Sequence, residues 1–511
     1  MKKLKYLYIV LISGVVAWSC EQIPNIADPD PNFTPTPVGG PIGAGNADFT
    51  KFIAIGNSLT AGFQAGALFD DGQKYSLPNI LSQQFAQVGG GDFIQPDINS
   101  VNGYNSTFSN PAEGIFLGRL VLVGSTPTPT PGDPASLPSP LNPAFQYTGD
   151  PINNFGVPGI LLGQALIPQT GDWSLFQADP RVNPFYARFA SSPGTSTIMG
   201  DAVAAAGTFF MFWLGNNDVL GYATTGATGA IPLTSVSDFG FQFGAAMTIL
   251  TTNNDSIQGV VGNIPNVTSI PFFTLVPYNA IPLDQATADF ANGAYVSYNG
   301  GIQGALQFGL IDQAEADLRT IQFTAGNNAI VTEDEDLTLL VLPDGQGGTI
   351  TLPNIRQLQA GELVTLPTSA VLGTLANPND PTSVIGVAVP IEDRMALTNN
   401  ELTEINTAID GFNASIEQTI VGLGLSDRIA MADVNKALDD LTNQGPTLVE
   451  GLVVTTSLVP PAGLFSEDGV HPNSRGYAFT ANVFIDAINA KFNANVPKPD
   501  LGNFPATGLP Q

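Results

Sequence analysis

The sequence predicts an α/β protein in which helices alternate with the strands of a parallel sheet. Phe52–Ile55 and Thr208–Leu214 are short apolar runs that each end at a glycine, as expected of buried parallel strands. Later segments place apolar residues at helical spacing, which is typical of amphipathic helices. Alternating strands and helices favour one parallel sheet covered by helices.

The remaining elements follow from the same patterns. Further strands are expected at Gln258–Ile264 and Arg428–Ala432, and helices at Pro78–Val88, Phe239–Thr252, Asn399–Leu423 and Ser474–Phe492. The helix over 399–423 has the clearest pattern, because Leu402, Ile405, Ile409, Phe412, Ile416 and Ile420 recur on one face.

Two segments interrupt this alternation and are predicted to be insertions. Residues 89–150 are rich in Gly, Pro, Ser and Thr, which predicts loops and one hairpin through Ile115–Val123. Residues 330–388 are rich in Val, Leu, Ile and Thr, which predicts a β-rich subdomain. Its acidic run Glu333–Asp336 is either a solvated loop or a Ca²⁺ site, and the sequence leaves this open.

The N-terminus has the organisation of an export signal. Lys2, Lys3 and Lys5 flank the apolar run Leu4–Trp18, and Cys20, the chain's single cysteine, follows at once. This looks like a bacterial lipoprotein signal, which implies removal of residues 1–19 and lipidation of Cys20; an ordinary secretion signal is the alternative. We expect an extracytoplasmic protein held to a membrane by lipid, the outer membrane in particular.

The predicted domain boundaries follow from composition. Residues 20–48 are rich in Pro, Gly and Asn and should form a disordered tether. A single domain with its two insertions is expected over 49–495, followed by a short tail over 496–511.

Composition excludes several classes of function. The chain carries 16 Lys and Arg against 44 Asp and Glu, a net charge of −28, so it is not expected to bind nucleic acid. With one cysteine it cannot form an internal disulfide, and with one histidine it lacks the usual ligands of a zinc site. It has no nucleotide-binding fingerprint, so neither a cofactor nor a catalytic metal is expected.

Catalysis by a serine nucleophile is a function class that this composition does not exclude. Ser58 lies in Gly-Asn-Ser-Leu-Thr-Ala-Gly, directly after the first expected strand, where an α/β sheet gathers functional groups. A serine nucleophile needs a base that a third group holds in one tautomer. Asp468-Gly-Val-His471-Pro-Asn supplies both, and His471 is the only histidine of the chain.

Two further turns could stabilise an oxyanion. Gly159 offers a main-chain N–H at the end of Asn-Phe-Gly-Val-Pro-Gly, and Asn217 offers a side-chain amide after the strand through Trp213.

These four blocks, in this order, resemble those of the SGNH/GDSL hydrolases. The resemblance implies a flavodoxin-like three-layer fold, with Ser58 as nucleophile, His471 as base and Asp468 as its orienter. It also implies an oxyanion hole made of the Ser58 N–H, the Gly159 N–H and the Asn217 side chain. Gly159 matches the family's spacing because it lies five residues after Asn154. Asn57 departs from the family, which has Asp there.

The sequence therefore predicts a carboxylic ester hydrolase, an esterase or lipase that works through an acyl-enzyme. Its partner would be an ester of a lipid or of an acylated carbohydrate. Two alternatives stay open: a carbohydrate O-deacetylase of the same family, and a non-catalytic surface lipoprotein that only binds.

Overall fold

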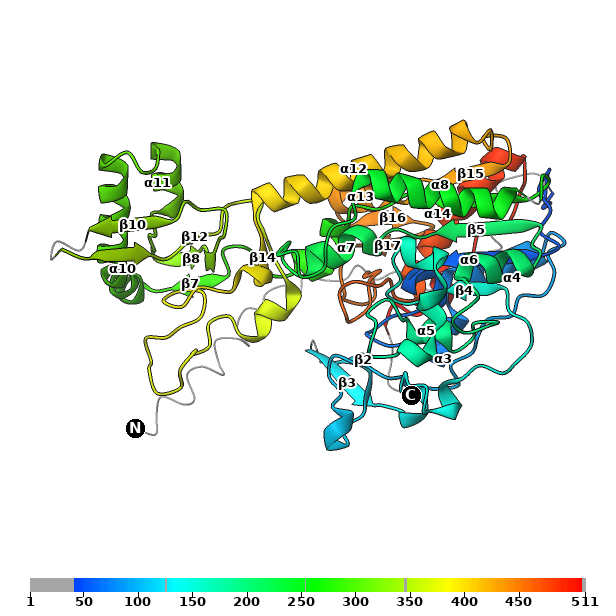
Figure 1. Ribbon diagram of the computed structural model, residues 1–511, viewed down its shortest axis with the longest axis horizontal. Helices are drawn as coiled ribbons and strands as arrows, with labels where there is room; N and C mark the ends of the chain where they lie inside the picture. Colours follow the sequence, from blue (N-terminus) through cyan, green and yellow to red (C-terminus); the bar gives the residue numbers. More distant parts are fainter. Residues whose placement is uncertain (1–40, 125, 253, 344–346, 508–511) are drawn as a thin grey trace. The chain divides into compact units, whose positions relative to one another are not determined.

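The protein, described from a computed structural model, is built on a five-stranded parallel sheet (Figure 1). The structure describes residues 41–507 except 125, 253 and 344–346. The sheet strands are β1 (Phe52–Gly56), β4 (Asn154–Gly156), β5 (Phe209–Trp213), β6 (Gln258–Gly262) and β15 (Ile429–Ala432). They lie in the order β15-β6-β5-β1-β4. If the five strands are numbered 1 to 5 along the chain and the sheet is read from β4, this order is 2-1-3-4-5.

Helices cover both faces of this sheet. Along β5, the Phe212 ring packs 5.7 Å from Phe243 of α8 (Val236–Thr251). The next residue, Trp213, packs 5.6 Å from Phe484 of α14 (Ser474–Phe492). Since consecutive strand side chains point to opposite faces, α8 and α14 lie on opposite sides. The core is therefore a three-layer α/β/α arrangement.

The four strands and four helices that the sequence predicts are all present. The helices are α4 (Leu77–Ala86), α8, α12 (Asn399–Gly422) and α14, each within three residues of its predicted bounds. The start of α12 is fixed by a capping box, in which the Thr398 hydroxyl accepts the Glu401 N–H and the Glu401 carboxylate accepts the Thr398 N–H. The fifth strand, β4, was not predicted, because three residues inside a glycine-rich turn carry no periodic signal.

A second hydrophobic core, formed by residues between Val276 and Ala396, begins well before the predicted insertion at 330. Its helices are α10 (Gln285–Gln307) and α11 (Gln313–Arg319). Its strands pair antiparallel: β7 (Ile281–Leu283) with β8 (Gly326–Asn328), β9 (Val331–Glu333) with β12 (Ile355–Gln357), β10 (Leu340–Pro343) with β11 (Thr349–Leu352), and β13 (Leu363–Val364) with β14 (Ala396–Leu397).

The sequence does not predict the 23-residue helix α10, because glycines and asparagines interrupt its apolar pattern. Tertiary contacts hold it instead. The buried Tyr295 and Tyr298 each donate a hydroxyl hydrogen bond of 2.6 Å, to the carbonyls of Val387 and Ile355. These contacts tie the helix to β12 and to the turn that contains Val387.

The predicted loop-rich insertion over 89–150 contains the antiparallel hairpin β2 (Leu117–Val123) and β3 (Thr126–Pro131). The shorter elements elsewhere are α2 (Ser58–Ala61), α3 (Asp70–Lys74), α5 (Pro184–Ala187), α6 (Ile198–Ala204), α7 (Asn217–Thr224), α9 (Pro271–Thr274), α13 (Val434–Gln444), β16 (Thr447–Val449) and β17 (Leu452–Val454). None of the helices within the described residues is both long and apolar enough to cross a bilayer. The predicted leader, Cys20 and most of the predicted tether lie outside the described residues.

The contact between α8 and α12 yields a stability prediction. Phe412 of α12 is fully buried and stacks on Phe239 with ring centroids 4.1 Å apart. Phe412→Ala should lower the free energy of unfolding by about 3–5 kcal/mol, because it leaves a cavity in the core. Val421→Ala on the same helix, where the side chain is 68% exposed, should change it by less than about 0.5 kcal/mol. Urea unfolding measures both, and equal effects of the two variants would contradict this packing.

Candidate active site

Three strand ends bring the predicted site residues to one edge of the sheet. Ser58 opens α2 directly after β1, Gly159 follows β4, and Asn217 opens α7 after β5. The next sheet strand along the chain, β4, pairs with one side of β1, whereas the strand after it, β5, pairs with the other side of β1. The strand order thus reverses beside β1, and α/β sheets bind ligands at such a switch point.

A chain of hydrogen bonds joins Ser58, His471 and Asp468. Ser58 Oγ lies 2.9 Å from His471 Nε2, and His471 Nδ1 lies 2.9 Å from Asp468 Oδ2. Ser58 is 7% exposed, and the side chains of His471 and Asp468 are 15% and 13% exposed. A hydroxyl, an imidazole and a carboxylate in this order can remove the hydroxyl proton as the oxygen attacks.

The Asp468 carboxylate accepts more hydrogen bonds than the one from His471. Its Oδ1 accepts the main-chain N–H groups of Val470 and His471, both at 2.9 Å, and the Ser466 hydroxyl at 3.1 Å. Its Oδ2 also accepts the Gly66 N–H at 2.9 Å. Burial favours the neutral acid, but the charge of His471 and these hydrogen bonds outweigh it and lower the pKa of Asp468 to about 2. The carboxylate therefore stays ionised and fixed in place.

The turn that presents Ser58 depends on small or capping residues. Asn57 caps α2, since its Oδ1 accepts the Leu59 N–H at 3.0 Å. Asp and Asn cap helices equally well, so Asn57 fills the position that is Asp in the resembling family without loss of the cap. A Cβ on Gly56 would lie only 2.7 Å from the Trp213 carbonyl, so only glycine fits between the two strands there.

Three groups that can donate hydrogen bonds follow β1, β4 and β5, which are neighbours in the sheet. Among the described residues, the main-chain N–H groups of Ser58 and Gly159 donate to no acceptor. Gly159 is exposed and has a φ of +74°, a conformation that favours glycine. Asn217 Nδ2 donates to the Ile160 carbonyl at 2.9 Å, and an amide nitrogen carries a second hydrogen for a ligand. These three groups have the chemistry of an oxyanion hole.

Two residues that sequence reasoning left without a role hold this edge together. The Oδ2 of the buried Asp218 accepts the Leu162 N–H, and its Oδ1 accepts the Thr234 hydroxyl, both at 2.9 Å. Burial raises the pKa of Asp218 to about 6. Asn154 Nδ2 donates to the Thr60 carbonyl at 3.0 Å. Asn154 opens the Asn-Phe-Gly-Val-Pro-Gly motif, and Asp218 directly follows Asn217. Closeness to a predicted site residue was therefore the only signal that the sequence offered for either of them.

A cleft with about 1220 Å³ of empty volume begins beside the site. Phe63, in its wall, packs 4.9 Å from the His471 ring. The lining residues carry no charge: Phe63, Gly66, Tyr104, Ser106, Pro111, Leu137, Pro138, Ser139, Pro158, Gly159, Phe176, Gln177, Pro184 and Phe185. Tyr104, Ser106, Pro111 and Leu137–Ser139 come from the loop-rich insertion, which therefore builds one wall of the cleft.

A second, smaller pocket of about 600 Å³ empty volume is also uncharged. It includes Leu59, which follows Ser58, and Val470 and Pro472, which flank His471. Its other walls come mainly from α13 and α14. Apolar space therefore adjoins both the serine and the histidine.

The environment of Asp468 predicts how stability depends on pH. A carboxylate whose pKa is lowered on folding stabilises the protein above its ordinary pKa of 3.8, and this contribution is lost as pH falls toward 2. Asp468→Asn should therefore lower the free energy of unfolding by about 2 kcal/mol at pH 7, and the difference from wild type should shrink between pH 4 and pH 2. Urea unfolding across this range measures it, with Asp410→Asn, an exposed carboxylate on α12, as the control. A difference that is constant with pH would contradict the assigned environment.

Comparisons with known proteins add little to this geometry. No protein-family model matches the chain, and no curated protein matches it. Among solved structures, it is similar to an extracellular lipase from Streptomyces rimosus at 12% identity and a TM-score of 0.28. That comparison covers 86% of this chain and 99% of the lipase chain. Assignments for this protein therefore rest on its own site.

Proposed function

We propose that the protein hydrolyses carboxylic esters with Ser58 as nucleophile, His471 as general base and Asp468 as the group that orients His471. One observation carries the proposal: the continuous chain of 2.9 Å contacts from Ser58 Oγ through the imidazole to Asp468. A purely structural serine has no need of a histidine that is itself held by an ionised carboxylate.

The reaction follows from these contacts. Asp468 accepts the Nδ1 proton of His471, so Nε2 is free to take the Ser58 proton while Oγ attacks the ester carbonyl. The Ser58 and Gly159 N–H groups and the Asn217 amide stabilise the oxyanion of the tetrahedral intermediate, where one donor is worth roughly 10²–10³ in kcat. His471 then protonates the departing alcohol. Water, deprotonated by the same imidazole, attacks the acyl-enzyme and releases the acid.

We also infer membership of the SGNH/GDSL hydrolases and a flavodoxin-like core. The strand order 2-1-3-4-5 supports this, since it is the order of flavodoxin-like sheets. The four sequence blocks support it too, because their polar residues meet at one sheet edge. The lysine-flanked apolar leader and Cys20 support export and lipid anchoring, in the outer membrane of a bacterium.

The substrate is best matched by a neutral ester with an apolar acyl group. Neither the cleft nor the second pocket has a charged lining residue, and Phe63, Phe176 and Phe185 offer apolar contact area. The net charge of −28 also disfavours anionic substrates. A carbohydrate O-deacetylase is the second candidate, because Tyr104 and Gln177 add uncharged hydrogen-bonding groups to the cleft.

Ser58→Ala should reduce ester hydrolysis at least about 10³-fold while leaving the melting temperature nearly unchanged, because the reaction loses its nucleophile and the fold loses only one hydroxyl. A fluorophosphonate probe should label the wild type and fail to label this variant. Ser237→Ala, an exposed serine on α8, should match wild type in both assays. Failure of the wild type to be labelled or to hydrolyse any ester would favour a lipoprotein that only binds.

A substrate panel distinguishes the two enzymatic candidates. p-Nitrophenyl esters of two to twelve acyl carbons and acetylated oligosaccharides should be compared by kcat/KM. We expect kcat/KM to rise beyond the acetyl ester, since each buried methylene contributes about 0.8 kcal/mol. A maximum at acetyl, together with faster release of acetate from the oligosaccharides, would assign the deacetylase function instead.

A further inference from the structure

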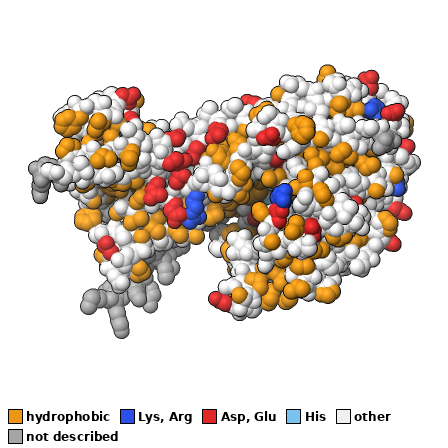
Figure 2. Space-filling model, in the orientation of Figure 1, with side chains coloured by type: hydrophobic (Ala, Val, Ile, Leu, Met, Phe, Trp, Pro, Cys, Tyr) orange, Lys and Arg blue, Asp and Glu red, His pale blue; other side chains and the backbone are white. Residues whose placement is uncertain are grey.

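Three carboxylates distant from Ser58 in the sequence meet where the second core joins α12. Glu335 lies in the loop after β9, Asp393 in the turn before β14, and Glu401 in the first turn of α12. One carboxylate oxygen of each lies within 4.8 Å of the others. Glu335 is exposed, Asp393 half-buried and Glu401 buried, so the group leads from the surface into the protein. Figure 2 shows acidic side chains gathered on the surface in this region.

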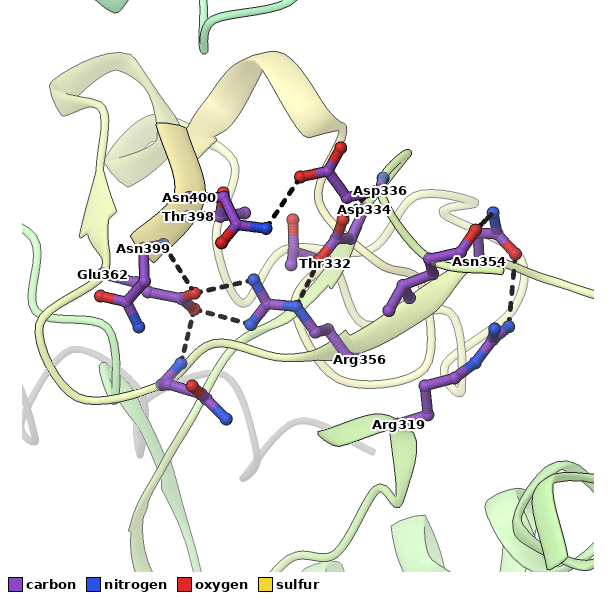
Figure 3. A network of polar contacts seen from close by, with 12 residues as sticks. Arg319, Thr332, Asp334, Asp336, Asn354, Arg356, Glu362, Thr398, Asn399 and Asn400 are labelled. Carbon is purple, nitrogen blue, oxygen red and sulfur yellow. Dashed lines mark hydrogen bonds and ion pairs between the residues drawn. The ribbon is translucent and has the colours of Figure 1, made fainter. Parts of the chain in front are cut away.

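Neighbouring contacts hold the Glu335 loop against the start of α12. On one side of Glu335, Asp334 forms a buried ion pair with Arg356. On the other side, Asp336 accepts a 3.1 Å hydrogen bond from Asn400 Nδ2 (Figure 3). The Glu335 carboxylate is thus kept near Glu401 by contacts made by its two neighbours.

The nearby cations are already paired with other carboxylates. The Arg356 guanidinium binds Glu362 through two hydrogen bonds of 2.7 and 2.8 Å in addition to Asp334 (Figure 3). Arg394, next to Asp393, pairs with Glu392. No ion pair among the described residues includes Glu335, Asp393 or Glu401. Within the described residues, the three carboxylates therefore have no cationic partner.

Glu401 gives a second, independent indication of a ligand. It is 7% exposed, and its Oε2 accepts the Thr398 N–H of the capping box. Its other oxygen, Oε1, is buried and has no hydrogen-bond partner. A buried carboxylate oxygen without a partner is costly, and a bound cation would satisfy it.

We propose that Glu335, Asp393 and Glu401 bind one calcium ion, with water completing its coordination. An all-oxygen ligand set favours a hard cation over zinc, whose structural sites are built mainly from nitrogen and sulfur ligands. Ca²⁺ takes six to eight oxygens in irregular geometry, whereas Mg²⁺ requires a near-ideal octahedron. The ion would join the loop after β9 to the first turn of α12, and so fasten the second core to the helix that packs on α8. Its role is structural, separate from ester hydrolysis.

Calorimetry on the EDTA-stripped mature chain tests this, with CaCl₂ and MgCl₂ titrated separately. We expect one Ca²⁺ site, a rise in melting temperature with CaCl₂, and Mg²⁺ affinity at least tenfold weaker. Asp393→Asn and Glu335→Gln should each weaken Ca²⁺ binding at least tenfold; Glu335 is exposed, so its variant should keep the wild-type circular dichroism. The controls Glu392→Gln, beside Asp393, and Glu333→Gln, in the same acidic run, are both exposed and should bind as wild type.

Three results would overturn the site. The first is that millimolar CaCl₂ produces neither heat of binding nor a shift in melting temperature. The second is that Asp393→Asn and Glu335→Gln bind Ca²⁺ as tightly as the wild type. The third is that the wild type binds Mg²⁺ as tightly as Ca²⁺. None of them bears on the esterase proposal, because the Ser58 assays use other residues and another readout.

Discussion

All strands of a parallel sheet run in the same direction, so their carboxyl ends meet at one edge, and the candidate site depends on this constraint. Ser58, Gly159 and Asn217 are far apart in the sequence but follow β1, β4 and β5, which are neighbours in the sheet. The Asp468–His471 segment lies directly before α14, whose Tyr477 donates a 2.6 Å hydrogen bond to the Phe63 carbonyl. The site is thus made by the sheet and closed by the last helix.

The polar groups of the site are held from several directions. Asp468 is bonded by Ser466, by Gly66 from the turn after α2, and by the N–H groups of its own loop, so the imidazole has little freedom to turn. Asp218 and Asn154 hold the backbone around the proposed oxyanion donors in the same way. In the proposed reaction, donors that are fixed before the substrate binds would not need to reorganise, and such preorganisation is a main source of electrostatic catalysis.

The two insertions serve different parts of the protein. The loop-rich one contributes Tyr104 and Leu137 to the uncharged cleft. The other has its own hydrophobic core and meets α12 through a buried network around Arg356.

The sequence by itself determined the features that short-range patterns encode. Apolar runs predicted β1, β5, β6 and β15, and helical spacing predicted α12, because both signals arise within one segment. Ser58, Asp468, His471, Gly159 and Asn217 stood out because they lie in short motifs, and the structure brings all five to one sheet edge.

Only the tertiary structure decided what depends on distant contacts. The strand β4 exists because β1 pairs with it, and α10 because Tyr295 and Tyr298 bond to Val387 and Ile355, which lie far along the chain. The acidic run was visible in the sequence, but Asp393 and Glu401 join Glu335 only through folding. Contacts between residues far apart in sequence leave no local periodicity, so no pattern within one segment could have predicted them.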